Sequence, residues 1–296
     1  MQLKTIDDLR DDDILWILGQ AENYRLGATV PPKFTETVVG LVFLDASLRT
    51  HFGFASAVAR LGGTSISVAD RRANDVSACE SIQDTLRVAC GYSDIVVARL
   101  KEPFPLIESN PGVHLINGGD RGPRQEHPTQ ALIDLFALRR SSKPLDELVV
   151  ALVGDLRMRA ARSLLALLRR FPPKRILAVT SSALMDAAEC AADSAANIEY
   201  GGMLDVLEAD FIYMIGIPNG AIPDEERSSF RLTRELLNRL SPEAIVLSPM
   251  PIIDEIHSEA RRDRRMQFLQ QSDDGLYVRM SLIEFLVKAS NRDEGR

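Results

Sequence analysis

Short apolar runs alternate with longer stretches of helical apolar spacing along most of the 296-residue chain. Strands of this kind, separated by helices, are typical of parallel sheets whose faces the helices cover. The expected strands are residues 41–44, 65–68, 95–97 and 113–116 in the first half, and 149–153, 175–179, 211–214 and 244–247 in the second. The alternation therefore predicts an α/β protein.

The two sets of strands are separated by a helix that is expected to begin near Pro128 and by the polar stretch 141–144, Ser-Ser-Lys-Pro, which ends it. A chain of this length can form two cores of similar size. We therefore expect one α/β domain over residues 1–140 and a second over 141–296, joined by the interdomain helix. A last helix at about 276–290 is apolar at helical spacing and is expected to pack back on the first domain.

Charge and composition exclude several classes of protein. The net charge of −7 and the pI near 5.3 argue against a general nucleic-acid-binding surface, which needs surplus lysine and arginine. The chain shows neither a signal peptide nor an apolar run of membrane-spanning length, so we expect a cytoplasmic protein with no membrane partner. Its three cysteines, Cys79, Cys90 and Cys190, are widely spaced, which favours reduced, buried thiols over disulfides or a metal site.

The apolar run 38–44 leads directly into the start of a helix at residues 47–51, Ser-Leu-Arg-Thr-His. The first backbone N–H groups of a helix lack helical partners and carry partial positive charge, so they attract anions. The hydroxyls of Ser47 and Thr50, the guanidinium of Arg49 and the nearby His51 would add further contacts to a phosphate. An ordinary capped helix is the alternative, because serine and threonine are common N-caps.

A second group of polar residues follows the predicted strand 113–116, where ligand sites of α/β proteins lie. Pro128 fits the first turn of a helix, so His127 is expected at the mouth of that helix. There a neutral imidazole can donate a hydrogen bond to a carbonyl oxygen on which negative charge develops. Gln130, one turn further, would hold the amide end of the same ligand. A solvated histidine at a helix start is the alternative.

These segments resemble the aspartate and ornithine carbamoyltransferases. Residues 47–51 are similar to the Ser-Thr-Arg-Thr-Arg carbamoyl-phosphate loop of that family, and 127–135, His-Pro-Thr-Gln-Ala-Leu-Ile-Asp-Leu, nearly match its other signature. Residues 249–255 resemble the Pro-Leu-Pro-x-x-Asp-Glu segment of the aspartate branch, and 275–280 are similar to the end of that branch. The resemblance covers almost the whole chain and is closest to the catalytic chain of aspartate carbamoyltransferase.

The resemblance implies a carbamoyl-phosphate-binding domain, followed by an acceptor-binding domain, and transfer of a carbamoyl group to an amine with no metal or organic cofactor. It also implies a homotrimer, and leaves open a larger assembly with other pyrimidine-pathway chains. By family position, the residues expected to bind carbamoyl phosphate are Ser47, Leu48 through its backbone, Arg49, Thr50, Arg99, His127, Gln130, and Pro249 and Met250 through their carbonyls. The expected catalytic residues among them are Arg49, Thr50, Arg99 and His127.

Two segments on the side expected to bind carbamoyl phosphate, the carbamoyl donor, depart from the family pattern. In residues 47–51, a leucine replaces the second residue of the family motif, which removes a hydroxyl, and a histidine replaces its last arginine, which makes a permanent charge titratable. The stretch 73–85 contains no lysine, although the aspartate branch has one in this loop that reaches a neighbouring subunit. Arg71, Arg72 or Arg87 are the candidates to replace it.

The acceptor side departs further. The aspartate branch clamps the acceptor carboxylate with a Thr-Arg-x-Gln segment, and the comparable stretch 214–220 reads Met-Ile-Gly-Ile-Pro-Asn-Gly. Glycine and proline side chains offer no hydrogen-bond donor to a carboxylate. The expected ligand of the acceptor α-carboxylate is Arg159, with Arg157 and Arg162 as alternatives. The arginines that follow the altered segment are either further carboxylate ligands or solvated or ion-paired surface residues; these are Arg227, Arg231 and Arg234.

Two functions are consistent with these residues. One is an active carbamoyltransferase of the aspartate type, which uses L-aspartate or another amine as acceptor. The other is a non-catalytic homologue that serves as an assembly or anion-binding subunit. A nucleotide-binding oxidoreductase would need a glycine-rich dinucleotide turn, and residues 154–158, Gly-Asp-Leu-Arg-Met, do not form one.

Overall fold

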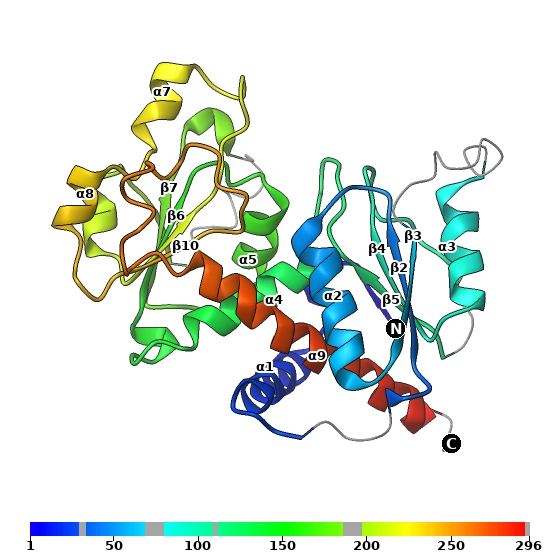
Figure 1. Ribbon diagram of the computed structural model, residues 1–296. Coiled ribbons are helices and arrows are strands. Elements are labelled where there is room, and N and C mark those ends of the chain that lie inside the picture. Colours follow the sequence, from blue (N-terminus) through cyan, green and yellow to red (C-terminus); the bar gives the residue numbers. More distant parts are fainter. Residues whose placement is uncertain (30–33, 69–79, 109–111, 186–196, 294–296) are drawn as a thin grey trace. The chain divides into compact units, whose positions relative to one another are not determined.

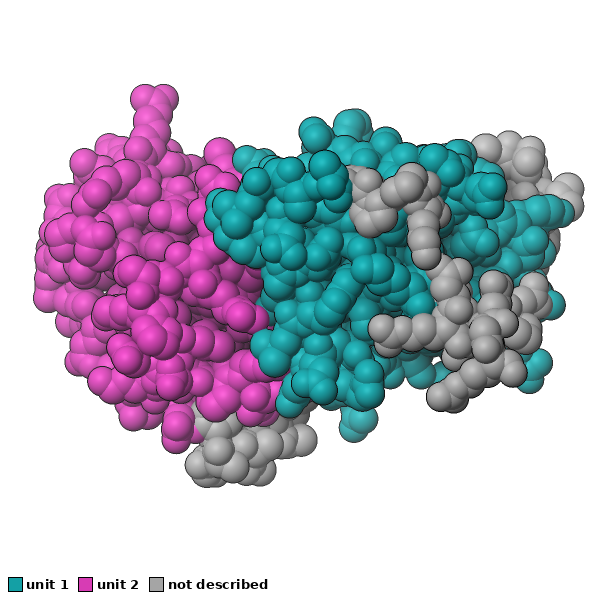
Figure 2. All heavy atoms as spheres, turned by 90° about the horizontal axis from the view of Figure 1, so that it is seen from below, with its two compact units in different colours: residues 1–133, 273–296 teal, residues 134–272 magenta. Residues whose placement is uncertain are grey.

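The computed structural model describes residues 1–29, 34–68, 80–108, 112–185 and 197–293. The chain forms two compact units, one made of residues 1–133 and 273–296 and the other of residues 134–272 (Figure 2). Helices α4 (Pro128–Leu138) and α9 (Phe268–Asp293) each begin in one unit and end in the other. The predicted domain limit at residue 140 remains a prediction.

The first unit is built on a parallel sheet with the strand order β1-β5-β4-β2-β3. The strands are β1 (Gln2–Leu3), β2 (Val38–Phe43), β3 (Thr64–Val68), β4 (Ile95–Arg99) and β5 (His114–Asn117). Helices α2 (Leu48–Leu61) and α3 (Ile82–Gly91) lie on opposite faces of this sheet (Figure 1). Because both faces are covered, β2, β4 and β5 are almost entirely buried and read as continuous apolar runs.

Helix α1 (Asp11–Arg25) packs against the C-terminal part of α9 within the first unit. The hydroxyl of Tyr24 donates a hydrogen bond of 2.6 Å to the buried carboxylate of Glu284. One turn away, the hydroxyl of Ser281 donates to the carbonyl of Ile17 at 2.7 Å. The last helix therefore packs back on the first unit, as the sequence predicts.

The second unit is built on a parallel sheet with the order β10-β9-β6-β7-β8. The strands are β6 (Val149–Val153), β7 (Arg175–Val179), β8 (Ile198–Tyr200), β9 (Phe211–Met214) and β10 (Ile245–Leu247), and the helices are α5 (Arg159–Arg170), α7 (Asp224–Ser229) and α8 (Arg234–Arg239). Alternate residues of β6 enter two cores. Val150 and Leu152 pack in the core that contains Leu164 of α5, and Ala151 and Val153 pack in the core that contains leucines of α8.

The predicted α/β class and the two parallel sheets are confirmed. The predictions for β6, β7 and β9 match the observed bounds, and the other predicted strands differ from the observed ones by a few residues at their ends. The last helix begins at Phe268, earlier than expected. Within the described part of the chain, no helix is both long and apolar enough to cross a membrane.

Of the three cysteines, Cys90 is buried in the core beneath α3, and burial raises the pKa of its thiol. A packing role fits this position, as expected. Cys79 and Cys190 lie outside the described residues.

Candidate active site

The carboxyl ends of β2 and β4 form the topological switch point of the first sheet. From β2 the chain continues to β3 on one side, and it then returns to β4 and β5 on the other side. The loops after β2 and β4 therefore leave in opposite directions, which opens a crevice where ligands of such folds bind. Ser47 follows β2, and Arg99 is the last residue of β4. Ser47 and Arg99, two of the residues predicted to bind carbamoyl phosphate, thus lie at the position that the topology favours.

Ser47 is the N-cap of α2. Its backbone is extended, and its hydroxyl oxygen accepts a hydrogen bond from the backbone N–H of Thr50 at 3.4 Å. The same hydroxyl donates to the side-chain oxygen of Thr50 at 3.1 Å, and Thr50 is buried. These bonds hold two hydroxyls at the positive end of a 14-residue helix, where an anion is favoured.

Arg99 and His127 meet beside this helix start. The Nη1 atom of Arg99 donates to the carbonyl of Gly118 at 2.9 Å and lies 3.4 Å from Nε2 of His127. Both side chains are buried. Because a guanidinium can only donate, Nε2 of the ring accepts in this arrangement and the ring proton is assigned to Nδ1, which lies 3.3 Å from the hydroxyl of Thr129.

Gly119 makes the approach of these two side chains possible. Its φ of +107° is one that residues with side chains rarely adopt. A Cβ atom at this position would lie 2.6 Å from Nη1 of Arg99 and 3.1 Å from the ring of His127. Only glycine leaves the space that the guanidinium and the imidazole occupy.

A buried carboxylate holds Arg99 from the other side. Oδ2 of Asp45 lies 3.6 Å from Nε of Arg99, and Asp45 also pairs with Arg121 at 3.3 Å. The backbone N–H of Asp45 donates to the carbonyl of Arg99 at 3.1 Å, which ties the ends of β2 and β4 together. The sequence did not predict Asp45 as a site residue.

Arg49 and Arg279 bring two positive charges together at the start of α2. Burial lowers the pKa of Arg49, and burial together with the charge of Arg49 lowers the pKa of Arg279 to about 10. The Arg279 guanidinium lies between two glycines, since a Cβ at Gly53 or at Gly275 would come within 2.5 or 2.6 Å of its Nη1 atom. Neighbouring cations in a partly dry environment favour a bound anion.

Further residues predicted on the carbamoyl-phosphate side lie in α2 and α4. The side chain of Leu48 is 72% exposed, so only its backbone N–H remains for the helix start. Gln130 lies in the first turn of α4, where its N–H bonds to the carbonyl of His127. The ring of His51 packs edge-on against Phe43 and lies 2.5 Å from the hydroxyl of Ser67 on β3.

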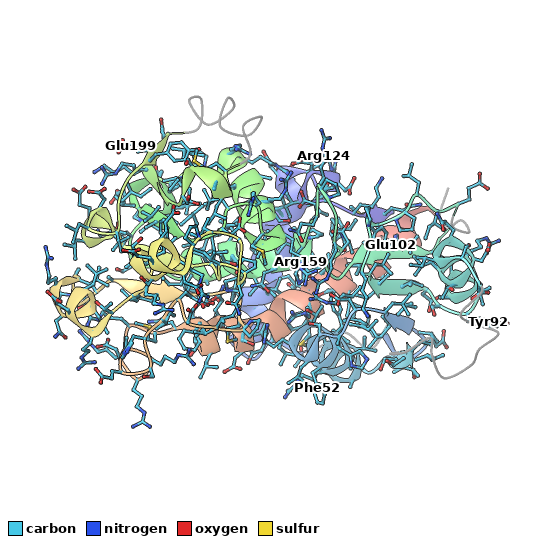
Figure 3. All side chains as sticks on the ribbon, turned by 90° about the horizontal axis from the view of Figure 1, so that it is seen from above. Phe52, Tyr92, Glu102, Arg124, Arg159 and Glu199 are labelled. Carbon is cyan, nitrogen blue, oxygen red and sulfur yellow. The ribbon has the colours of Figure 1, made fainter. Side chains whose placement is uncertain are left out.

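In the second unit, Arg159 is the first residue of α5 and is half-buried (Figure 3). The competing Arg157 is already engaged, because its guanidinium donates two hydrogen bonds to Asp155 and a third to the carbonyl of Ala183. Arg162 lies one turn further along α5. Of the two alternatives to Arg159, Arg157 is therefore the weaker candidate for a ligand-binding residue.

The segment that contains Pro249 and Met250 is held by a chain of hydrogen bonds within the second unit. Met250 has a φ of +51°, and its N–H donates to the hydroxyl of Ser248 at 3.1 Å. The N–H of Ser248 donates to Oε1 of Gln271, whose Nε2 donates to the buried carboxylate of Asp134 at 2.5 Å. Tyr213 donates to the other oxygen of Asp134 at 2.6 Å. This network fixes an unusual backbone conformation beside β10.

Tyr213→Phe is expected to lower the free energy of unfolding by about 1–3 kcal/mol, because Asp134 would lose one of its donors in a fully buried position. Burial and the adjacent Asp134 raise the pKa of Tyr213 well above its usual value, so the hydroxyl keeps its proton. Urea denaturation measures the difference. Tyr92→Phe is the matched control, because Tyr92 is 75% exposed and its change is expected to have little effect.

Comparison with known proteins agrees with this geometry. Residues 2–140 match the family model described as aspartate/ornithine carbamoyltransferase, carbamoyl-P binding domain, and residues 146–286 match the model of its Asp/Orn binding domain. The chain belongs to the aspartate/ornithine carbamoyltransferase family. It is an enzyme of the aspartate carbamoyltransferase type.

Relatives of this carbamoyltransferase match over nearly the whole chain. The aspartate carbamoyltransferase catalytic subunit of Archaeoglobus fulgidus is 33% identical over 95% of this chain and 97% of that protein. The corresponding subunit of Methanoculleus marisnigri is 31% identical over 96% of this chain and 98% of that protein. The solved catalytic subunit of M. jannaschii aspartate transcarbamoylase has a TM-score of 0.83 at 28% identity, over 97% of this chain and 98% of that chain.

The arginines near the altered acceptor segment of this carbamoyltransferase are ion-paired. Arg227 and Arg231 both bind the carboxylate of Asp254, and Arg234 lies 3.9 Å from Asp263. Of the two readings that the sequence left open for these arginines, ion pairing is the one observed. Residues 73–79 of the stretch without lysine, and the candidates Arg71 and Arg72, lie outside the described residues.

Two charged residues beside this candidate site were not predicted from the sequence. Asp45 lies two residues after the end of β2 and could have been found as a polar residue at the carboxyl end of a strand. Arg279 gave no such signal, because it lies 230 residues from Arg49 in the chain, in a helix with an apolar pattern. Its position became visible only with the packing of α9 on α2.

Proposed function

We propose that this enzyme transfers the carbamoyl group of carbamoyl phosphate to the amine of an amino acid. L-Aspartate is the reference acceptor, because the relatives are named for it. The observation that carries the proposal is the meeting of Arg99 and His127 beside the capped start of α2 at the switch point of the first sheet. In the proposed reaction the neutral amine attacks the carbamoyl carbon, a tetrahedral intermediate forms, and phosphate leaves.

The phosphate of the donor is proposed to bind at the start of α2. Ser47 and Thr50 offer hydroxyls, Leu48 offers its backbone N–H, and Arg49 offers a guanidinium. The nearby Arg279 adds positive potential without being exposed to solvent. As the C–O bond breaks, negative charge grows on the leaving phosphate, so this cationic site stabilises the transition state more than the ground state.

The carbonyl oxygen of the donor is proposed to bind between Arg99 and His127, with Gln130 at the amide end. Negative charge develops on this oxygen when the amine attacks, and preorganised donors stabilise it. An oxygen in this position accepts from Nη1 of Arg99, and it accepts from His127 if the ring proton lies on Nε2. The two tautomers of the neutral ring therefore serve different states. With the proton on Nδ1, Nε2 accepts from Arg99 before carbamoyl phosphate binds; with the proton on Nε2, the ring donates to the bound carbonyl oxygen.

The acceptor-side roles stay proposals that follow family position. Arg159 is proposed to bind the α-carboxylate of the acceptor, and its place at the first residue of a helix supports anion binding. Pro249 and Met250 are proposed to offer backbone carbonyls to the carbamoyl nitrogen. The hydrogen-bond network through Ser248 and Gln271 supports this role, because it holds that backbone in one conformation.

We also propose that the enzyme forms a homotrimer, which can join a larger assembly with other pyrimidine-pathway chains. Helix α2 exposes Leu48 and Phe52, the latter labelled in Figure 3, and the adjoining edge strand β3 exposes Ile66 and Val68. Neighbouring exposed apolar side chains at a sheet edge support contact with another chain. A cytoplasmic location stays a prediction.

Carbamoyl phosphate is expected to raise the melting temperature by about 5 °C at a concentration near 100 times its Kd, because it binds only the folded protein. Arg49→Gln should remove most of the shift. Arg60→Gln is the matched control, because Arg60 is exposed at the other end of the same helix and its loss should leave the ligand-induced shift unchanged. No shift in the wild-type protein at millimolar donor would contradict the proposal.

The non-catalytic alternative is not favoured by the comparisons, because the relatives are named catalytic subunits. Turnover distinguishes the two functions. Release of phosphate from carbamoyl phosphate in the presence of an amino acid acceptor, together with formation of the carbamoylated amine, is expected for the wild-type enzyme. Donor binding without turnover on any amine would support the alternative.

A further inference from the structure

The second sheet has its own switch point, at the carboxyl ends of β6 and β9. The chain runs from β6 to β7 and β8 on one side, and then returns to β9 and β10 on the other side. The segments that leave this edge are Gly154–Asp155 after β6 and Ile215–Gly216 after β9. Ligands of such sheets bind where these segments diverge, so side chains near Gly216 are placed to contact a ligand.

Glu255 is a buried carboxylate at this position. It is 5% exposed, and its Oε2 atom accepts hydrogen bonds from the backbone N–H groups of Ile253 at 2.8 Å and Asp254 at 3.1 Å. Its Oε1 atom is buried and has no hydrogen-bond partner within the described part of the chain. A buried carboxylate oxygen without a donor costs folding free energy, and such atoms are uncommon outside functional sites.

Gly216 leaves space directly in front of this carboxylate. A Cβ atom built on Gly216 would lie 3.8 Å from both carboxylate oxygens of Glu255 and 3.6 Å from the side chain of Ile253, which is ordinary contact. A group of a ligand can therefore stand beside Gly216 without a clash. Gly216 is itself partly exposed, so this space is not sealed from solvent.

Within the described part of the chain no cation forms an ion pair with Glu255, and the nearby Arg261 donates to the carbonyls of Ile253 and Ile256. Arg227 and Arg231 are bound to the neighbouring Asp254, and Arg227 also donates to Asn219 at 2.8 Å. In its ionised form Glu255 therefore places a negative charge beside Gly216, although burial raises the pKa of this carboxyl group. A carboxylate placed here would meet a like charge, whereas an N–H donor would complete the hydrogen bonds of Oε1.

We propose that Glu255 determines acceptor specificity, and that the preferred acceptor is an amino acid whose side chain ends in an N–H donor, an amide or an ammonium, in place of a carboxylate. The donor group would occupy the space beside Gly216 and bind Oε1 of Glu255. The inference rests on the proposed carbamoyl transfer and specifies its acceptor.

L-Asparagine and L-aspartate provide the most direct test, because they are nearly identical in shape and differ in the group that would face Glu255. The wild-type enzyme is expected to carbamoylate L-asparagine with a kcat/KM at least about tenfold higher than L-aspartate. L-2,4-Diaminobutyrate tests the ammonium in the same assay. A higher kcat/KM for L-aspartate than for both nitrogen-bearing acceptors would overturn the inference.

The Glu255→Gln variant tests the role of the residue. Glutamine keeps the size and can still accept from the N–H groups of Ile253 and Asp254, but it replaces the charge by an amide that can donate to a carboxylate. The ratio of kcat/KM for L-asparagine over L-aspartate is expected to fall by about tenfold or more. Glu259→Gln is the control, because Glu259 is exposed and its change should leave the ratio unaltered. An unchanged ratio in Glu255→Gln would contradict the role of Glu255.

Binding gives a second measurement that needs no turnover. Succinamate and succinate lack the reacting amine, and succinamate is expected to give the larger rise in melting temperature when added after carbamoyl phosphate. A larger rise with succinate would overturn the inference but leave the proposed function intact. Loss of the rise caused by carbamoyl phosphate alone would instead contradict the proposed function.

Discussion

Arg99→Met is expected to lower kcat by about 10²- to 10³-fold, because it removes a preorganised donor from the oxygen on which charge develops. The guanidinium lies 3.4 Å from Nε2 of His127 and is anchored on the carbonyl of Gly118, so no other described side chain holds the same position. Asp45 keeps its ion pair with Arg121 in the variant, which limits the loss of stability. Steady-state kinetics with saturating carbamoyl phosphate measures the effect.

Arg124→Ala is the control for loss of a positive charge from the same unit. Arg124 is exposed (Figure 3), and its removal is expected to change kcat by less than about twofold, since surface charges contribute little. A loss of less than tenfold in Arg99→Met, in a variant that unfolds at the wild-type urea concentration, would rule out Arg99 as the principal donor.

Gly154→Ala is expected to lower the free energy of unfolding by about 3–5 kcal/mol or to prevent folding. The φ of Gly154 is +122°, and a Cβ atom there would lie 2.0 Å from the carbonyl oxygen of Ile215. Both obstacles are in the backbone, so no side-chain rotation relieves them. The soluble yield and the urea midpoint of the variant measure the effect.

Gly19→Ala provides the matched control. Gly19 lies within α1 and has no atom within 4 Å of the position that a Cβ would take. Alanine there should stabilise the helix by about 0.5–1 kcal/mol. A free energy of unfolding of Gly154→Ala within about 1 kcal/mol of the wild-type value would contradict this prediction. The close approach of the segments after β6 and β9 would then not constrain the second sheet.

The strands that the sequence predicted best are those whose neighbours bury them on both sides. β6, β7 and β9 are continuous apolar runs because each lies inside a sheet covered on two faces. β1 has only two residues, and β8, Ile198–Tyr200, is partly exposed at a sheet edge. Neither leaves an apolar run in the sequence, so both were missed.

The residues of the candidate site that could be predicted are those whose positions are set by their neighbours in the sequence. Ser47 and His127 were predictable because an N-cap and a Pro-led helix start are set by adjacent residues. The neighbourhood of Arg49 and Arg279 depends on how two helices from opposite ends of the chain pack. Whether Oε1 of Glu255 has a hydrogen-bond partner depends on which donors lie near it in the folded chain. The order of residue types in the sequence does not show this.

The contacts between α1 and α9 determine the order in which the chain can complete its two units during synthesis. Tyr24 and Ile17 bind residues that follow them by 260 and 264 positions, and these emerge from a ribosome on the order of 10–50 s later. The second unit is continuous in sequence, so all of its strands are available before the first unit receives its last helix. A nascent or truncated chain that ends at residue 272 would therefore carry a second unit of full length and a first unit whose α1 lacks its partners on α9.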